Sequence, residues 1–480
     1  MNIRASVYSA AASTYIIAAI QLVSTIITTR LLTPAEIGVF TIALSLVLIC
    51  GCVADWGVNI YIVQRHTTDL SGLRSCAWVA WTGALVMGTA VALASGGLAA
   101  FYNAPEVEPL LLILSVRIFL YPCGVVSGAL VARDMRFKPL ALMNISNALV
   151  QGTVSVVLVY HGARHLGLAI GYVSGFLAEL AWAAYFVPEY FLLRPEPRNT
   201  REIYRYGFLN TSIAVLSTVA ANASGLIIGY FLGTRDTGFF ARASTLVGIV
   251  RRGVDGVINS VGIPAFSSAN ADGADMTKFF LGATAMLTGV VWPLFAMVLM
   301  LSEPIVVLLL GQAWVGIVPI GQILCVANMI TAMSVLSGAL LLGLKRSGVL
   351  LRREVWAQSA IVLFTLAGAQ FSLHAVALAM VAASGTQLLI TFHLLAREIQ
   401  LYWTDALREN SKSLAALGAT ALGAGVVSWL TGHTHVVVQI IAGGAGGVAC
   451  WLITAWLLHH PLMSELRRIR SALLRLPQTL

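Results

Sequence analysis

Apolar segments of about twenty residues, separated by short charged clusters, run through almost the whole of this 480-residue chain. A helix that crosses a bilayer needs about 20 mostly apolar residues, because each residue adds about 1.5 Å and the hydrocarbon core is about 30 Å thick. Only 10% of the residues are charged and the mean hydropathy is +0.86, which leaves too few polar residues to cover a water-soluble surface. The chain is therefore predicted to be an all-α membrane protein.

If the charged clusters are loops, the pattern predicts about fourteen transmembrane helices. A β-barrel does not fit, because barrel strands alternate polar and apolar residues, whereas stretches such as 110–120 and 281–301 are almost continuously apolar. The predicted helices cover residues 7–29, 37–55, 76–101, 109–131, 139–160, 166–192, 206–232, 237–263, 279–301, 317–343, 353–370, 373–396, 413–431 and 436–459.

The distribution of Lys and Arg predicts the orientation. These residues collect on the cytoplasmic side of membrane proteins, and 24 of the 29 fall in alternate loops when the N-terminus is placed inside. Both termini are thus expected in the cytoplasm of a bacterial inner-membrane protein, and the net charge of +9 is mostly this topology signal rather than a nucleic-acid footprint. The six Cys lie in or beside predicted helices without ligand spacing, so we expect no metal and no cofactor.

Two short motifs recur along the chain. Residues 30–40 match residues 230–240 at an offset of 200, sharing Gly38 with Gly238, and Ser127–Leu130 recurs as Ser337–Leu340 at an offset of 210. A repeat of six helices keeps its orientation, so two six-helix lobes related by a pseudo-twofold axis along the membrane normal are expected, with a cavity between them. The predicted parts are 1–200, 201–400, and 401–480 with the last two helices and a basic tail.

Several of these motifs are typical of one family. The chain resembles the Wzx-type polysaccharide flippases of the multidrug/oligosaccharidyl-lipid/polysaccharide exporter superfamily. The resemblance implies translocation of undecaprenyl-pyrophosphate-linked oligosaccharide units by alternating access, for exopolysaccharide or lipopolysaccharide O-antigen, with a polymerase and a chain-length regulator as partners. It extends from residue 30 to about 345 and is carried by Arg30–Gly38, Ala54–Gly57, Arg133–Phe137, Gly238–Ala243, Ile263–Ser267 and Glu303–Trp314.

Polar and small residues share one face of the helix expected at 237–263. At 100° per residue, the residues within about one third of the circumference include Arg251, Arg252, Asp255 and Asn259. A charge at a helix centre costs on the order of 3 kcal/mol. Either these groups face a wet cavity, or the helix ends early and they anchor it at the interface. In the first case Asp255 pairs with one arginine and the remaining positive charge is available to a pyrophosphate.

Three further charged groups are expected inside the bilayer. Arg117 and Arg242 can each meet a phosphate or a sugar acid in the cavity, or reach the lipid headgroups. Glu179 is the best candidate for proton coupling, and the alternative is a hydrogen-bonded structural carboxyl. The polar residues suited to sugar hydroxyls, or equally to hydrogen bonds between helices, include Gln21, Thr218 and Asn222.

Three other functions compete with a polysaccharide flippase. Polysaccharide polymerases and ligases carry their active site on a large periplasmic loop, whereas the periplasmic connections predicted here are short, so no enzyme is expected. Cation-coupled multidrug exporters of the same superfamily usually have twelve helices and an acidic cavity, whereas the charge here is mainly basic. A lipid II-type peptidoglycan-precursor flippase also has fourteen helices and a basic cavity, and only the motif pattern disfavours it.

Overall fold

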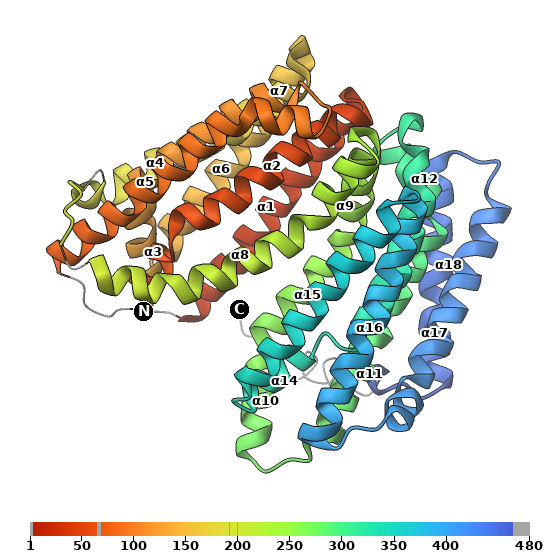
Figure 1. The fold of residues 1–480 in the computed structure, drawn as a ribbon. Helices are drawn as coiled ribbons and strands as arrows, with labels where there is room; N and C mark the ends of the chain where they lie inside the picture. The colour runs from red at the N-terminus through yellow and green to blue at the C-terminus, as the bar shows by residue number, and fades with distance from the viewer. Residues whose placement is uncertain (1–2, 65–68, 192, 199, 464–480) are drawn as a thin grey trace, which may run out of the picture. The chain divides into compact units, whose positions relative to one another are not determined.

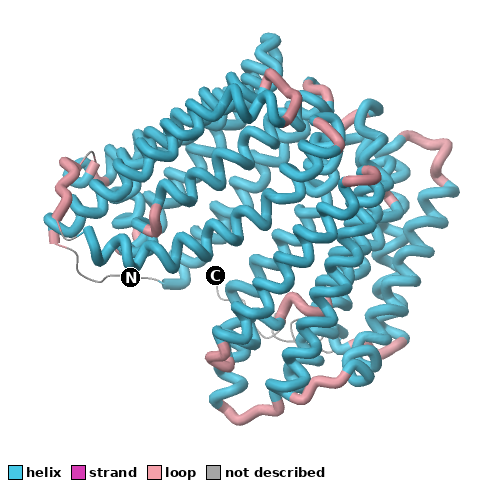
Figure 2. Tube along the Cα trace, viewed as in Figure 1, coloured by secondary structure: helices cyan, strands magenta, loops and turns pink. Residues whose placement is uncertain are grey.

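Hydrocarbon offers no hydrogen-bond partners, so a chain that crosses it must pair its backbone groups within helices or a closed barrel. The computed structural model describes residues 3–64, 69–191, 193–198 and 200–463, without the side chains of 3–12, 209, 210, 213, 257, 259 and 260. These described residues form helices joined by short loops, with no strand among them (Figure 2).

The chain divides into two compact units, Met1–Ala241 and Arg242–Leu480. Figure 1 labels most of their helices. Unit 1 holds α1 (Ile3–Leu31), α2 (Pro34–Asp55), α3 (Val58–Gln64), α4 (Leu70–Phe101), α5 (Val107–Arg133), α6 (Phe137–Leu158), the π-helical turn η1 (Val159–Ala163), α7 (Arg164–Phe186), the 3₁₀ turn η2 (Pro188–Tyr190), α8 (Thr200–Phe231) and the start of α9 (Thr234–Val257). Unit 2 holds the rest of α9, the π-helical turn η3 (Ile258–Gly262), α10 (Ile263–Ala271), α11 (Met276–Met300), α12 (Ser302–Leu309), the 3₁₀ helix η4 (Gln312–Ile317), α13 (Val318–Ala332), α14 (Ser337–Gly343), α15 (Ser347–Ala369), α16 (Leu373–Ile399), α17 (Trp403–Leu430) and α18 (Val436–Leu457). The division into 1–200, 201–400 and 401–480 stays a prediction.

Eleven stretches of the described chain are long and apolar enough to cross a bilayer. One of them, Phe137–Phe186, has 50 residues and contains two helices, because the backbone turns at Gly162 (φ 90°) and Arg164 (φ 46°). Two further helices of spanning length, α9 and α15, fall outside this set because they carry several charged residues. The described residues are thus consistent with about fourteen transmembrane helices, and the predicted fold class is confirmed.

Two predicted helices are interrupted. The helix expected at 317–343 is divided, because residues 333–336 form tight turns in which the Met333 and Ser334 amides bond carbonyls only three residues back. The helix expected at 237–263 neither ends early nor stays regular: it passes through the wider turn η3 and continues as α10 to Ala271. Residues 333–336 contain no glycine or proline, whereas the widened turn has a signal in the sequence, because Gly262 ends η3 and Pro264, which has no backbone N–H, lies in the first turn of α10.

The motif at residues 30–38 specifies how α2 begins. Thr33 is the N-cap, Pro34 is the first helical residue, and the Glu36 amide donates to Thr33 Oγ1 over 3.4 Å. In return, the Thr33 backbone amide donates to Glu36 Oε2 over 2.8 Å, which completes a capping box. Glu36 also pairs with Arg164 at 3.6 Å, which ties the start of α2 to the start of α7.

The two glycines of the sequence repeat pack directly against each other. A Cβ placed on Gly38 would lie 1.7 Å from the Thr234 carbonyl oxygen, and one on Gly238 would lie 1.9 Å from the Pro34 carbonyl oxygen. The contact is reciprocal, since each glycine meets the residue four positions before its counterpart. In a bilayer such packing matters, because helices associate through close van der Waals contact rather than through the hydrophobic effect.

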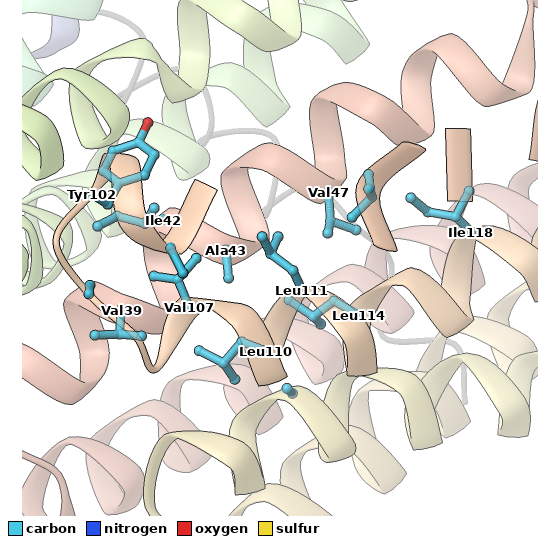
Figure 3. Packing of buried hydrophobic residues seen from close by; sticks show 14 of the residues in the cluster. Val39, Ile42, Ala43, Val47, Tyr102, Val107, Leu110, Leu111, Leu114 and Ile118 are labelled. Atoms are coloured by element: carbon cyan, nitrogen blue, oxygen red, sulfur yellow. The ribbon is translucent and has the colours of Figure 1, made fainter. Parts of the chain in front are cut away.

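Unit 1 is centred on the packing of α2 against α5. Figure 3 shows Val39, Ile42 and Val47 of α2 facing Leu111 and its neighbours on α5. These side chains are at most 4% exposed. They interdigitate as core residues of a soluble protein do, and they hold the middle of α5, where Arg117 lies, next to α2.

A buried polar cluster holds the last helices on unit 2. His460, 2% exposed and just beyond α18, accepts a hydrogen bond at Nδ1 from the Leu462 amide (3.3 Å), so its Nε2–H donates to Ser413 Oγ of α17 (3.1 Å). Thr288 of α11 contacts Ser413 (3.1 Å) and Asn410 (2.6 Å). The cluster therefore joins α11, α17 and the chain after α18 through a neutral imidazole.

We expect Gly38→Ala to destabilise the protein by about 1–3 kcal/mol, because the new methyl group overlaps a backbone carbonyl that cannot move without bending α9. Thermal unfolding of the purified protein measures the effect. Gly51→Ala is the matched control: it lies on the same helix, a Cβ there meets nothing within 4 Å, and better helix propensity should leave stability unchanged or raise it by up to about 1 kcal/mol. Equal effects at both positions would contradict the packing argument.

We expect the His460 cluster to weaken as the pH falls. Burial, with a smaller contribution from Lys412, lowers the pKa of His460 from its ordinary 6.5. The unfolded state then binds more protons than the folded state, so stability is full above pH 6.5 and declines below it. The melting temperature of the wild type should drop more between pH 7.5 and 5.5 than that of His460→Gln. The exposed His433→Gln should behave like the wild type.

Candidate functional site

Unit 2 contains a polar pocket of about 430 Å³ bounded by α9, α13, α14, α15 and α16. We call it the α9–α15 pocket. Its polar lining residues are Arg251, Asp255, Asn328, Thr331, Arg353, Glu354, Gln358, Ser384 and Gln387. The two helices that contribute the charged groups, α9 and α15, are the two whose charges set them apart from the apolar spans. Four charged residues of these two helices thus line one cavity, which lowers the cost of placing their charge in a bilayer.

Arg353 is the most deeply placed cation of this pocket. Its residue is 6% exposed, its Nε donates to Thr391 Oγ1 of α16 over 3.1 Å, and its Nη1 bonds the carboxylate of Glu354. Thr391 Oγ1 in turn donates to the Gln387 carbonyl over 2.7 Å. A guanidinium has five N–H donors in a planar fork, so these contacts orient the group while using two of its donors.

Arg251 and Asp255 form the second charged pair of the pocket. They lie one helical turn apart on α9, with 3.6 Å between Arg251 Nε and Asp255 Oδ2, and the pair is open to the cavity, with side chains 63% and 43% exposed. The described lining therefore holds two arginines and two carboxylates and has no net formal charge. The excess positive charge expected from the α9 face is absent from the lining, because Arg252 is exposed and does not line this pocket.

Unit 1 contains a second, smaller pocket of about 250 Å³, the α2–α5 pocket, lined by residues of α2, α3, α5 and α8. Its charged members are Asp55 and Arg117. The Tyr121 hydroxyl donates to Asp55 Oδ1 over 2.6 Å. The Arg117 guanidinium lies over the rings of Tyr172 (4.6 Å) and Phe176 (4.8 Å) and donates to the Tyr172 hydroxyl. Aromatic faces compensate part of the desolvation of such a cation.

The remaining predicted cations differ in their surroundings. Arg242, at the start of unit 2 on α9, has a buried Nε without a hydrogen-bond partner among the described residues. Arg252 is exposed, and the side chain of Asn259 lies outside the described part of the chain. The α9–α15 pocket therefore brings together Arg251 and Asp255 of the predicted set, and not Arg242 or Arg252.

The predicted polar residues of unit 1 lie apart from one another. Asn222 turns onto its own helix and donates to the Thr218 carbonyl over 2.8 Å, while Thr218 Oγ1 is 3.1 Å from Cys52 Sγ, a residue of the α2–α5 pocket. Gln21 is exposed on α1. Glu179 lines neither of the two pockets and accepts a hydrogen bond from Asn147 Nδ2 of α6 over 2.6 Å.

Sequence reasoning missed Arg353 and Glu354. The eleventh helix was expected to begin at residue 353, with Arg353 at its cytoplasmic end and Glu354 in its first turn, whereas α15 begins at Ser347 and places Arg353 almost two turns into the helix. A usable signal was present: Glu354, Gln358 and Ile361 follow a helical 3.6-residue stripe, and all three line the pocket.

Comparison with known proteins agrees with this architecture. The chain is 23% identical over 340 residues to the lipopolysaccharide biosynthesis protein WzxC of Escherichia coli, covering 70% of this chain and 69% of that protein. It is 24% identical over 412 residues to the teichuronic acid biosynthesis protein TuaB of Bacillus subtilis, covering 83% and 84%. Its fold is similar to that of the lipid II flippase MurJ in an inward closed conformation, with a TM-score of 0.75, 13% identity and coverage of 95% and 99%.

The family of the chain is shown by a family model that matches more than half of its residues. The model of the polysaccharide biosynthesis protein family matches residues 27–319, which is more than half of the chain and includes both glycines of the α2–α9 contact. The motifs that suggested a Wzx-type transporter lie in the same range. The chain therefore belongs to this polysaccharide biosynthesis protein family.

Proposed function

We propose that this protein is a flippase for undecaprenyl-pyrophosphate-linked oligosaccharide units in exopolysaccharide or O-antigen biosynthesis. The observation that carries the proposal is the α9–α15 pocket, in which Arg353 is buried, oriented and paired on the wall of a cavity large enough for a ligand. Cavities that bind small molecules typically measure about 300–1,000 Å³. The named relatives, which act in polysaccharide biosynthesis, point to a glycan-bearing substrate.

The paired charges suit a site that must alternate between empty and occupied. A pyrophosphate that enters the pocket competes with Asp255 and Glu354 for the guanidinium groups of Arg251 and Arg353. Each arginine exchanges one anionic partner for another, so no cation is left unpaired at bilayer depth when the substrate leaves. Pairs between guanidinium and phosphate are charge-assisted and are frequently bidentate, which supplies affinity for the new partner.

Sugar units of the substrate require hydrogen-bonding groups without charge. The α9–α15 pocket offers the amides of Asn328, Gln358 and Gln387 and the hydroxyls of Thr331 and Ser384 beside its arginines. Amides and hydroxyls both donate and accept, so they match sugar hydroxyls without a preference for one sugar. This lining supports a head group that combines phosphate and carbohydrate.

We also propose how the protein is placed in the membrane and which proteins it works with. The protein spans the inner membrane with both termini in the cytoplasm, and works by alternating access of two six-helix lobes, with the last two helices as an addition. It transports rather than catalyses, and it passes its cargo to a polysaccharide polymerase and a chain-length regulator. The excess of Lys and Arg in alternate loops supports the orientation.

Two carboxylates of unit 1, those of Glu179 and Asp55, are candidates for proton coupling. Glu179 is held by Asn147 outside the two described pockets, whereas Asp55 lines the α2–α5 pocket, bonded to Tyr121. We retain Glu179 as the proposed coupling residue. An ionised carboxylate within a spanning helix is costly, and Asn147 can remain bonded to its oxygen in either protonation state.

Arg353→Gln should lower the flipping rate about ten- to hundredfold, because a charge-assisted hydrogen bond to the substrate contributes about 1.5–3 kcal/mol. The measurement is leaflet exposure of undecaprenyl-linked glycan in cells that lack the gene and carry the variant. Arg352→Gln is the matched control, because it removes the same charge one residue away from an exposed position outside the pocket. Membrane levels and melting temperature separate loss of transport from loss of folding, and Arg353→Lys should keep part of the activity.

The same strain distinguishes the competing functions. Accumulation of inward-facing glycan lipid, cleared by the wild type, supports the proposal. Accumulation of lipid II instead would indicate a peptidoglycan-precursor flippase. Unaltered surface polysaccharide together with greater drug sensitivity would indicate an exporter and would overturn the proposal.

Glu179→Gln should abolish the dependence of flipping on a pH gradient while leaving substrate binding within about twofold of the wild type, because the amide keeps the size of the side chain but cannot titrate. Reconstituted vesicles with an imposed gradient provide the measurement. Glu189→Gln, on the exposed turn η2, is the control and should behave as the wild type. If Asp55→Asn abolishes the dependence and Glu179→Gln does not, coupling belongs to the α2–α5 pocket.

A further inference from the structure

Unit 2 contains a large apolar groove next to the α9–α15 pocket. It measures about 670 Å³ and is bounded mainly by α9, η3, α10 and α11, and we call it the α9–α11 groove. Each of its described lining residues is apolar or glycine, so no side chain of the lining offers a strong hydrogen bond. Several of them, including Ile249, Val261 and Leu294, are exposed, so the groove is open to its surroundings.

Helix α9 separates the groove from the polar pocket and contributes to both. Val250 and Val254 line the groove, while the residues that follow them, Arg251 and Asp255, line the α9–α15 pocket. Ile258, at the start of η3, lines both cavities. The two cavities therefore adjoin along α9 and meet at Ile258, one charged and hydrogen-bonding, the other wholly apolar.

The open volume of the groove depends on the absence of a side chain at Gly253. Gly253 faces it from the middle of the α9 segment, and a Cβ at this position would meet nothing within 4 Å. Any larger residue would project into the open volume. The wider turn η3 adds Val261 and Gly262 to the wall, where a regular helix would present different residues.

We propose that the α9–α11 groove binds the isoprenoid chain of the lipid carrier while the α9–α15 pocket holds its pyrophosphate and sugars. This inference rests on the proposed function and adds a second subsite to it. A glycan or a peptide would leave its polar groups without partners in the groove, which excludes them as occupants. A hydrocarbon chain needs only van der Waals contact, and its attachment to an anionic head selects the cavity next to the arginines.

The groove gives the prenyl chain of the carrier an apolar environment while the polar head group is bound in the α9–α15 pocket. Because the prenyl chain stays in the groove, it does not have to leave an apolar environment when the head group binds to the arginines. The chain also contributes affinity that does not depend on the sugar sequence, because each buried methylene adds to binding irrespective of the head group.

The test compares three probes on the purified full-length protein: inorganic pyrophosphate, farnesyl pyrophosphate and undecaprenyl pyrophosphate. The wild type should bind the prenyl probes more tightly than pyrophosphate. Gly253→Leu should weaken binding of undecaprenyl pyrophosphate about tenfold or more and leave the affinity for pyrophosphate unchanged, because the leucine fills the groove and does not touch the arginines. Gly248→Leu is the control: it lies on the same helix, meets open space, and lines neither cavity.

A second readout locates the chain directly. A diazirine-bearing prenyl pyrophosphate should label peptides of α9 and α11 in the wild type, and Gly253→Leu should abolish that labelling. An excess of phospholipid should not compete, whereas undecaprenyl pyrophosphate should. Competition by phospholipid would assign the groove to ordinary membrane lipids and overturn the inference.

The outcomes separate this inference from the function on which it rests. Binding that depends on Arg353 but not on chain length or on Gly253→Leu would overturn the groove assignment alone. Failure of all three probes to bind would remove the anion pocket and the proposed function with it. Labelling confined to helices other than α9 and α11 would place the chain elsewhere and contradict the inference.

Discussion

The cost of an unpaired charge in hydrocarbon organises this protein. On lenient scales a charged side chain at the centre of a spanning helix costs about 2.5–3.5 kcal/mol, and burial without a partner costs more. Three of the arginines within α5, α9 and α15 meet this cost in different ways. Arg353 bonds Glu354 and Thr391, Arg251 pairs with Asp255, and Arg117 lies over aromatic rings. Each of these three arginines lines one of the two described pockets that contain charged residues.

The same constraint links the fold to transport. A site that held a permanent excess of cations would bind an anion tightly, but it would leave those cations exposed to the bilayer interior whenever it was empty. The α9–α15 pocket keeps its charges balanced, so the substrate has to displace carboxylates to bind. We infer that such a site favours turnover over affinity, because the arginines have an anionic partner in both states, while the displaced carboxylates lose theirs and so weaken net binding.

Helix packing depends on a second requirement, the close approach of helix backbones to one another. Bilayer helices gain little from hiding apolar surface from water, so contacts that bring main chains together carry much of the association. The reciprocal contact of Gly38 with Gly238 is of this kind, and the sequence repeat explains why both partners are glycine. The opposite use of glycine occurs at Gly253, where the absent side chain leaves space open instead of allowing contact.

The sequence by itself determined most of the helices. Twenty-residue apolar runs indicated helices, and the helical spacing indicated that Asp255 pairs with an arginine, because both depend on residues within a few positions of one another. The start of α2 was expected at residue 37, whereas the helix begins at Pro34, after the Thr33 N-cap. Only the tertiary structure decided which charges share a cavity. Arg353 is oriented by Thr391, which lies 38 positions away on the next helix, and Asp55 meets Tyr121 across 66 positions. Periodicity within one helix carries no information about such partners, since they are set by how separate helices pack.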